Sequence, residues 1–265
     1  DEETQWQVVI QDEGLGVPTG EGSLVSENNP YTATDLLPAH RYEYYVRAYC
    51  NDVEQSEWVG PATFITECAT FDTPFYESFN DDDPDTQKFC WSFIDANSDT
   101  NTGEWMMTAT HPSLQKGGGF FNPTTEFDDW LVSPAINVNG VKELRFKYRA
   151  QFSFFTGPPR FGVEVLMSTT DTNPSSFSVI SPLEIFTNSE YIEKSLYFEA
   201  NATVYIAFRV PPEFDVAGGA SILNIDDVSI VDAPECPNPS DLTVNTTFMD
   251  GANLSWSPGF QETSW

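Results

Sequence analysis

Residues 35–49 have the sequence DLLPAHRYEYYVRAY, which places a proline turn just before a long run of alternating apolar and polar side chains. Alternation with a period of two is typical of a β-strand that buries one face. Shorter runs of the same kind recur along the chain, and Gly, Pro, Thr, Ser and Asn separate them. No convincing amphipathic helix interrupts them. The sequence therefore predicts an all-β protein with many short strands.

The two ends of the chain carry the same short motif. Glu262-Thr263-Ser264-Trp265 repeats Glu3-Thr4-Gln5-Trp6 at three of its four positions, and the step from Trp6 to Trp265 gives a period of 259 residues. Self-similarity at a fixed period is typical of tandem arrays. We therefore expect a repeat unit of a longer chain, or a subunit that completes its neighbour.

The two end segments resemble complementary parts of a fibronectin type III domain, an immunoglobulin-like β-sandwich. Residues 36–42 match the Leu-x-Pro-x-x-x-Tyr pattern of that family, which implies that the Tyr42 hydroxyl bonds to the upstream backbone as a tyrosine corner. Residues 239–244 and 252–256 match the first two strands of the family, with Trp256 as the core tryptophan. The resemblance implies two incomplete halves, the later strands in residues 1–67 and the first strands in residues 234–265.

Neither half could bury its inner face alone, and soluble proteins avoid open sheet edges and exposed apolar faces. We therefore expect Trp256 of one unit to pack in the same core as Trp6 and Tyr42 of the next unit. Such head-to-tail joining needs no closure, so it would give a beaded or filament-like assembly.

Residues 68–233 resemble the cleaved-adhesin or MAM-like modules of large secreted proteins from Bacteroidetes, including the gingipain adhesin regions. The motifs that carry the resemblance occur in the family's order: FYESF at 75–79, CWS at 90–92, IDANSD at 94–99 leading to Trp105, DDWLVSPAI at 128–136 and NIDDVSI at 224–230. The family fold is a jelly-roll β-sandwich. The alternating stretches at 144–148, 161–167 and 204–210 agree with a sandwich in which each strand has one buried face.

The chain has four cysteines, and an even count in an extracellular-looking β protein favours two disulfides. Cys68 and Cys90 flank the start of the middle module and could bridge its first strand. Cys50 and Cys236 lie in the two half-domains, so they would pair only across a repeat boundary. Four buried free thiols are the alternative.

The charge balance is strongly acidic, with 41 acidic residues against 11 basic ones and a formal charge of −30. Such a chain would be repelled by nucleic-acid phosphates and by an anionic membrane surface. No apolar run is long enough to cross a membrane. The acidic residues either form a solvated surface or, in part, bind calcium.

Two groups of oxygen-bearing side chains could bind Ca²⁺, which takes six to eight oxygen ligands. In the first group, Glu77 would meet Asp226, because alternation places Asp226 on the core side with Val228, where a carboxylate needs a partner. The adhesin resemblance implies the same pairing. The second group is Asp95, Asn97 and Asp99, although the glycine and closing glutamate of an EF-hand are missing. A surface turn and a hydrogen-bonded buried acid are the alternatives, and the acidic run at 81–85 is expected to be solvated.

An aromatic stretch offers a candidate ligand surface. Phe152, Phe154 and Phe155 lead to Arg160, and strand alternation should turn at least one of the three rings outward. Phe120, Phe121 and Phe214 could join them. Packing of these rings at the edge of the sandwich or at a domain interface is the alternative.

Catalysis is not expected. The two histidines, His40 and His111, lie in predicted solvated loops, and no nucleophile motif accompanies either. We therefore expect a non-catalytic repeat unit of a secreted or cell-surface adhesin or stalk, stabilised by calcium and joined head to tail to neighbouring units. It could bind carbohydrate or another surface protein. The alternative is a carbohydrate-binding module appended to a secreted enzyme.

Overall fold

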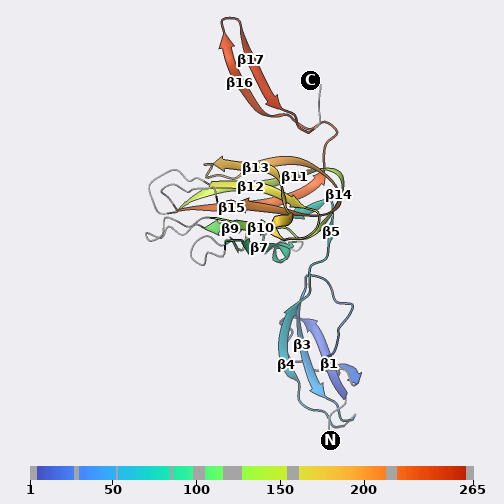
Figure 1. The fold of residues 1–265 in the computed structure, drawn as a ribbon. Coiled ribbons are helices and arrows are strands. Elements are labelled where there is room, and N and C mark those ends of the chain that lie inside the picture. The colour runs from blue at the N-terminus through green and yellow to red at the C-terminus, as the bar shows by residue number, and fades with distance from the viewer. Residues whose placement is uncertain are drawn as a thin grey trace. The chain divides into compact units, whose positions relative to one another are not determined.

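The computed structural model describes residues 5–26, 30–51, 53–83, 86–97, 105–115, 127–153, 161–212 and 220–260. Regular structure in these ranges is β-strand, apart from two short 3-10 helices, η1 (Lys88–Cys90) and η2 (Pro174–Ser176). The chain divides into two compact units, unit 1 (Asp1–Ala69) and unit 2 (Thr70–Trp265). Figure 1 colours unit 1 in blues and continues through unit 2 to red. No helix in the described part is long and apolar enough to cross a membrane.

Unit 1 is a single antiparallel sheet. Its strands are β1 (Gln5–Asp12), β2 (Ser23–Ser26), β3 (Arg41–Ala48) and β4 (Val59–Ile65), in the order β2-β1-β3-β4. Val8 lies opposite Val46, and Ile10 lies opposite Tyr44. Because directly opposed residues share a face, these side chains lie on the same side of the sheet. The described strands of unit 1 thus form one sheet, and its assignment as part of an incomplete sandwich stays a prediction.

Unit 2 contains the remaining strands. They are β5 (Phe71–Asp72), β6 (Phe75–Glu77), β7 (Ser92–Asp95), β8 (Trp105–Met107), β9 (Pro112–Gln115), β10 (Asp129–Val132), β11 (Ile136–Ser153), β12 (Phe161–Ser168), β13 (Ser178–Phe186), β14 (Ile192–Val210), β15 (Ala220–Asp232), β16 (Ser240–Phe248) and β17 (Gly251–Ser257). Strands β16 and β17 form a separate two-stranded sheet, the hairpin, whereas the others belong to one large sheet system.

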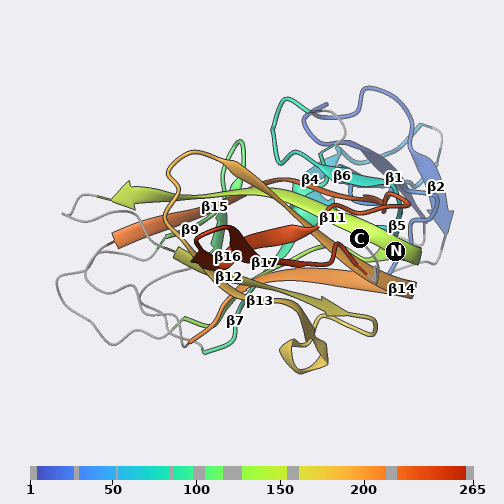
Figure 2. The same cartoon turned by 90° about the horizontal axis from the view of Figure 1, so that it is seen from above.

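Strand β14 joins the two layers of the large sheet system. Residues 192–204 pair with β11, and residues 205–210 pair with β12 and β10. Strand β15 lies on the other side of β11, so that β14, β11 and β15 run alongside one another (Figure 2). This arrangement forms a β-sandwich. The predicted all-β sandwich fold is confirmed, whereas the two incomplete sandwich halves on either side of it in the sequence stay a prediction.

The core of the sandwich is apolar and rich in aromatic residues. Phe146 meets Phe208 edge-on with 4.8 Å between ring centroids, and Leu144, Ile206 and Ile230 are fully buried beside them. Burial of a side chain of this size contributes roughly 1.5–3 kcal/mol relative to leaving it exposed. The sandwich of unit 2 thus buries an apolar core of its own.

Cysteine pairing follows the prediction for the middle module. Cys68 and Cys90 are joined in a disulfide. Cys50 and Cys236 are free and exposed. Their predicted pairing is between neighbouring units, so it stays a prediction.

Candidate association surface and cation site

The turn before β3 fixes the start of the sheet in unit 1. The buried Tyr42 hydroxyl accepts a hydrogen bond of 3.0 Å from the backbone N–H of Leu37. The Tyr42 ring also stacks on Phe64, with 5.6 Å between centroids. The predicted tyrosine corner is therefore confirmed, and it ties residues 35–40 to the sheet.

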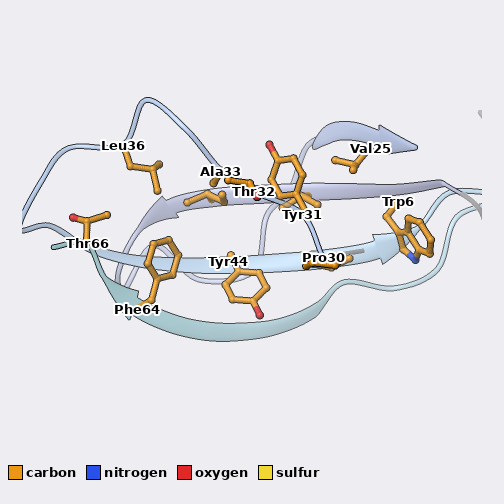
Figure 3. A pocket seen from close by; sticks show the side chains of 13 residues that line it. Trp6, Val25, Pro30, Tyr31, Thr32, Ala33, Leu36, Tyr44, Phe64 and Thr66 are labelled. Carbon is orange, nitrogen blue, oxygen red and sulfur yellow. The ribbon is translucent and has the colours of Figure 1, made fainter. Parts of the chain in front are cut away.

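One face of the unit 1 sheet holds a cavity of about 810 Å³, which we call the groove. Its floor consists of side chains from β1, β3 and β4: Trp6, Val8, Ile10, Tyr44, Val46 and Phe64. Residues 30–36 supply further lining side chains, and Figure 3 shows Tyr31, Ala33 and Leu36 on that segment and Tyr44 and Phe64 on the sheet. Tyr31 and Tyr44 stay exposed. The segment covers the floor only in part.

Polar side chains make local contacts on the opposite face of the same sheet. Glu43 is buried, and its carboxylate accepts hydrogen bonds from Gln11 Nε2 at 2.7 Å and Gly16 N at 2.8 Å. The Arg47 guanidinium lies 4.4 Å from the centre of the Trp58 ring and donates to Gln7. The opposite face is thus held largely by polar contacts, whereas the groove side is apolar and incompletely covered.

The hairpin of unit 2 also carries an exposed apolar face. Val244 lies directly opposite Leu254, so both point to one side of the ribbon, and alternation along β17 adds Trp256 to that side. Leu242 precedes them on β16, beside a register shift between Ser240 and Thr243. The exposed fractions are 77% for Leu242, 60% for Val244, 57% for Leu254 and 42% for Trp256. We call these four side chains the hairpin face. A two-stranded ribbon is marginally stable on its own in water.

The predicted metal ligand Glu77 lies at the end of β6 and is only 2% exposed. Its carboxylate accepts hydrogen bonds from Phe79 N at 2.6 Å, Thr86 Oγ1 at 2.7 Å and Gln87 N at 2.8 Å. Burial raises the pKa of Glu77 above its ordinary value and the charge of Asp83 adds to the rise, whereas the three hydrogen bonds oppose it. Glu77 is thus a desolvated carboxylate for which a cation would be a favourable neighbour.

A shallow cavity of about 430 Å³ lies beside Glu77. Asp83, Asp227 and Ser78 line it together with Glu77 and supply further oxygen atoms. Lys147 lines it as well, and its Nζ is 2.6 Å from Asp227 Oδ2. Oxygen atoms of this kind are the ligands that Ca²⁺ prefers.

Asp226 does not take the orientation that alternation predicted, because β15 contains a bulge. Lys147 pairs with Asp226 and Arg145 with Ser229, so β15 has one more residue than β11 over this step. Asp227 has a positive φ of 46°, which accommodates the additional residue in β15. As a result, Ile225 and Val228 both enter the core. Asp226 is left half-buried, outside the cavity lining beside Glu77.

The surroundings of Asp226 still matter for its charge. Burial raises the pKa of Asp226 to about 6, and the neighbouring charge of Asp227 adds to the rise. The Asp227 backbone N–H, the nearby Tyr191 hydroxyl and Lys147 act in the opposite direction. The structure therefore places Asp227, and not Asp226, in the lining of the cavity beside Glu77. Strand alternation had predicted that Asp226 would lie beside Glu77. Aspartate tolerates a positive φ better than most residues, which is the one sequence signal for this bulge.

Side chains alone do not form a metal cage in the described ranges, because no three or more His, Cys, Asp or Glu residues there lie close enough to hold an ion. A calcium ion at Glu77 would need hydroxyl, main-chain or water oxygens as further ligands. Calcium binding therefore stays a prediction.

The other predicted site residues fall into two groups. Asp95 ends β7 opposite Asp129, and Asn97 follows shortly after it. Asp99, Phe154, Phe155 and Arg160, as well as the side chain of Phe152, lie outside the described residues. Phe120, Phe121 and Phe214 lie outside them too. The second calcium group and the aromatic ligand surface therefore stay predictions.

The solvated state predicted for the loops holds only in part. His40 Nε2 lies 2.9 Å from Asp12 Oδ1 near the surface. His111 is half-buried instead, in a turn where Thr108 Oγ1 accepts from its backbone N–H, and its ring lies edge-on to Tyr191. Burial lowers the pKa of His111, and Arg149 lowers it further. In the acidic run, Asp81 forms an ion pair with Lys88.

Comparisons with known proteins find similarity among solved structures. No family model and no curated protein matches the chain. It is similar to the K3 cleaved adhesin domain of Lys-gingipain from Porphyromonas gingivalis W83, with 23% identity and a TM-score of 0.47 over 60% of this chain and 98% of that one. The K1 domain of the same protein gives 19% identity and a TM-score of 0.45 over 61% and 99%. Cleaved adhesin domains are thus among the structures that the chain is similar to, as its motifs predicted.

A sugar-binding structure is also among the matches. The N-terminal cellulose-binding domain of β-1,4-glucanase C from Cellulomonas fimi is 16% identical, with a TM-score of 0.34 over 58% of this chain and 93% of that one. At these identities the likeness concerns the fold, so the function has to be argued from the chain's own surfaces.

Proposed function

We propose that the chain is a non-catalytic repeat unit of a secreted or cell-surface adhesin or stalk, which joins head to tail with neighbouring units. The observation that carries this proposal is that one chain has two incompletely covered apolar β surfaces, the groove of unit 1 and the hairpin face of unit 2. Contiguous exposed apolar patches are rare on monomeric proteins and are typical of association sites.

The rest of the molecule suits such a role. The sandwich of unit 2 has its own closed core, and a disulfide holds Cys68 to Cys90. A stable unit that repeats along an array produces a long molecule. The weak contacts of many copies together give a strong attachment. The charge of −30 keeps such an array soluble.

Bead clustering tests the adhesive role. Beads coated with the full chain are expected to cluster, and soluble chain added in excess should disperse them by competition. Beads coated with a non-adhesive protein of similar charge serve as the control. Coated beads that stay dispersed over a wide range of surface densities would contradict the proposal.

Carbohydrate binding is the second candidate, and the sequence observation that favours it is the run of Phe152, Phe154 and Phe155 before Arg160. Affinity electrophoresis of the full chain in gels that contain soluble polysaccharides would reveal binding as slowed migration. The double variant F154A/F155A should migrate normally in the same gels. Equal retardation of the variant and the parent chain would exclude these rings from the binding surface.

Calcium stabilisation belongs to the same proposal. Glu77 would hold the ion together with hydroxyl, main-chain or water oxygens in the adjoining cavity, and the bound ion would supply a charge that neutralises the buried carboxylate. An excess of chelator is expected to lower the Tm of unit 2, because a ligand bound only by the folded state stabilises it by mass action. The variant E77Q should melt at a temperature that the chelator does not change. If the chelator also leaves the Tm of the parent chain unchanged, the proposed calcium binding is wrong.

A further inference from the structure

The groove and the hairpin face have complementary chemistry. The groove floor is apolar and aromatic, with Val8, Ile10 and Tyr44 at its centre, and the cavity above it has room for several side chains. The hairpin face presents four large, exposed apolar side chains on a two-stranded ribbon. Two β layers that pack face to face bury such side chains between them, about 10 Å apart.

The sequence that follows the hairpin indicates which sheet it should cover. Strand β17 is followed within a few residues by Glu262-Thr263-Ser264-Trp265. Nearly the same tetrapeptide, Glu3-Thr4-Gln5-Trp6, leads into β1, where Trp6 lines the groove. The motif that leads into the unit 1 sheet thus also stands just after the hairpin, and this repeat favours a sheet of the unit 1 kind as the surface that the hairpin covers.

We propose that the hairpin of one copy of this chain docks on the groove of a second copy and completes a two-layer sandwich there. The inference rests on the proposed function and names the surfaces through which units join. Leu254 and Trp256 enter the groove from above, and the apolar floor of unit 1 loses its remaining contact with water. The four exposed apolar side chains of the hairpin are buried in the same step.

The backbone can take part as well. Residues 30–36 cross the groove without strand structure, and β17 has β16 on only one of its two edges in the described residues. An incoming strand that adds to an extended segment forms main-chain hydrogen bonds while alternate side chains fill pockets. The second edge of β17 is thus placed to pair with residues 30–36. The completed layer would contain β16, β17 and this segment.

A matched pair of variants tests the docking. Leu254 belongs to the hairpin face, whereas Asn253 is the next residue and points to the other side. The full chain should associate with rising concentration in light-scattering chromatography. L254D should weaken that association by about tenfold or more, as removal of a buried anchor does. N253D adds the same charge on the opposite side, so it should associate like the parent chain.

Mixing two disabled variants identifies the partner surfaces. I10D removes the groove and keeps the hairpin, so it should be a monomer. L254D keeps the groove and should also be a monomer. A mixture of the two should form a one-to-one dimer that grows no further, because each dimer has one intact pair of surfaces. This result does not require I10D to keep its unit 1 folded, since only its hairpin takes part.

Several outcomes would overturn the docking. The first is equal association of L254D and N253D, and the second is a mixture of I10D and L254D that stays monomeric. A monomeric parent chain would also overturn it, and loss of stability in L254D would then place the hairpin in the groove of its own chain. Failure of the proposed function gives a different result, in which the mixed dimer forms while chain-coated beads do not cluster.

Discussion

Arg209 shows how one side chain can stabilise several parts of the sandwich in unit 2. Its Nε is 2.6 Å from Asp128 Oδ1, and its Nη1 is 2.8 Å from Glu164 Oε1. The guanidinium also lies 4.8 Å from the centre of the Trp130 ring. Only 22% of the Arg209 side chain is exposed. Two carboxylates from different segments thus share one partly buried cation.

The variant R209M should therefore destabilise unit 2 by roughly 2–3 kcal/mol, because it leaves two poorly solvated carboxylates without their partner. K147M is the matched control, since Lys147 and Asp227 form an ion pair in which both side chains are about half exposed. Its cost should stay below about 1 kcal/mol. Urea unfolding of the full chain measures both. An equal loss of unfolding free energy in the two variants would contradict the expectation that the more buried ion pairs contribute more to stability.

His111 makes stability depend on pH. Burial, followed by the charge of Arg149, lowers the pKa of His111 in the folded chain below its ordinary value of 6.5. The unfolded chain therefore takes up the proton first as the pH falls. The resulting loss of stability begins near pH 6.5 and is complete below the folded-state pKa.

The variant H111Q cannot take up this proton, so it should lose less stability than the parent chain between pH 7.5 and pH 5. Urea unfolding of both chains at several pH values isolates the effect, because the other titrating groups are common to both. Above pH 7.5 the difference between the two chains should be constant. A difference that stays constant down to pH 5 would show that His111 is not desolvated.

At the scale of elements, the short strands β5 and β6 depend on contacts made elsewhere in the chain. β5 pairs over two residues with β11, and β6 pairs over three residues with β15. Both strands lie within the loop that the Cys68–Cys90 disulfide closes. The bridge reduces the freedom of this loop in the unfolded chain, and the loop includes Glu77.

Replacement of both cysteines by serine should therefore cost about 3 kcal/mol, the value expected for a loop of this length. The comparison is best made in a C50S/C236S background, so that exposed thiols do not form new bridges. Thermal or urea unfolding of the two chains gives the difference. An unchanged stability would mean that the loop is held by its packing alone.

The sequence predicted the features that depend on neighbouring residues in the chain. It did not predict the features that depend on contacts with segments far away in the sequence. Alternation identified strands within β3, β11, β12 and β14. The pattern at 36–42 predicted that the Tyr42 hydroxyl bonds to the upstream backbone, and the structure shows the N–H of Leu37 as its partner. The bulge at Asp226 and Asp227 was not predicted, because it depends on the register between β15 and β11. For the same reason Asp227 was missed as a residue beside Glu77. His111 was predicted to be solvated, because the local sequence does not indicate that its loop packs against Tyr191.

At the scale of the whole molecule, two opposing forces act on association. Copies with a charge of −30 repel one another, and at physiological ionic strength salt largely screens this repulsion between charges more than about 8 Å apart. Burial of the groove and the hairpin face favours association and depends less on salt. Experiments on assembly are therefore best done at physiological ionic strength or above.

Docked copies also make a prediction about the two free cysteines. Cys50 follows β3, which contributes to the groove floor, and Cys236 precedes the hairpin, so docking should bring Cys236 of one copy near Cys50 of the next. With oxidised glutathione, the two thiols form one protein disulfide and release two molecules of reduced glutathione. The parent chain should then give a ladder of linked species on a non-reducing gel.

The single variants show whether this link has a direction. C50S and C236S each lack one half of the pair, so neither should form the ladder, and a mixture of the two should form a linked dimer between Cys236 of C50S and Cys50 of C236S. Peptide mapping identifies the linked residues. L254D should suppress the link, because it prevents docking without removing a thiol. A ladder that L254D leaves unchanged, or a map that joins Cys50 to Cys50, would mean that the exposed thiols meet by random collision and that the copies do not align head to tail.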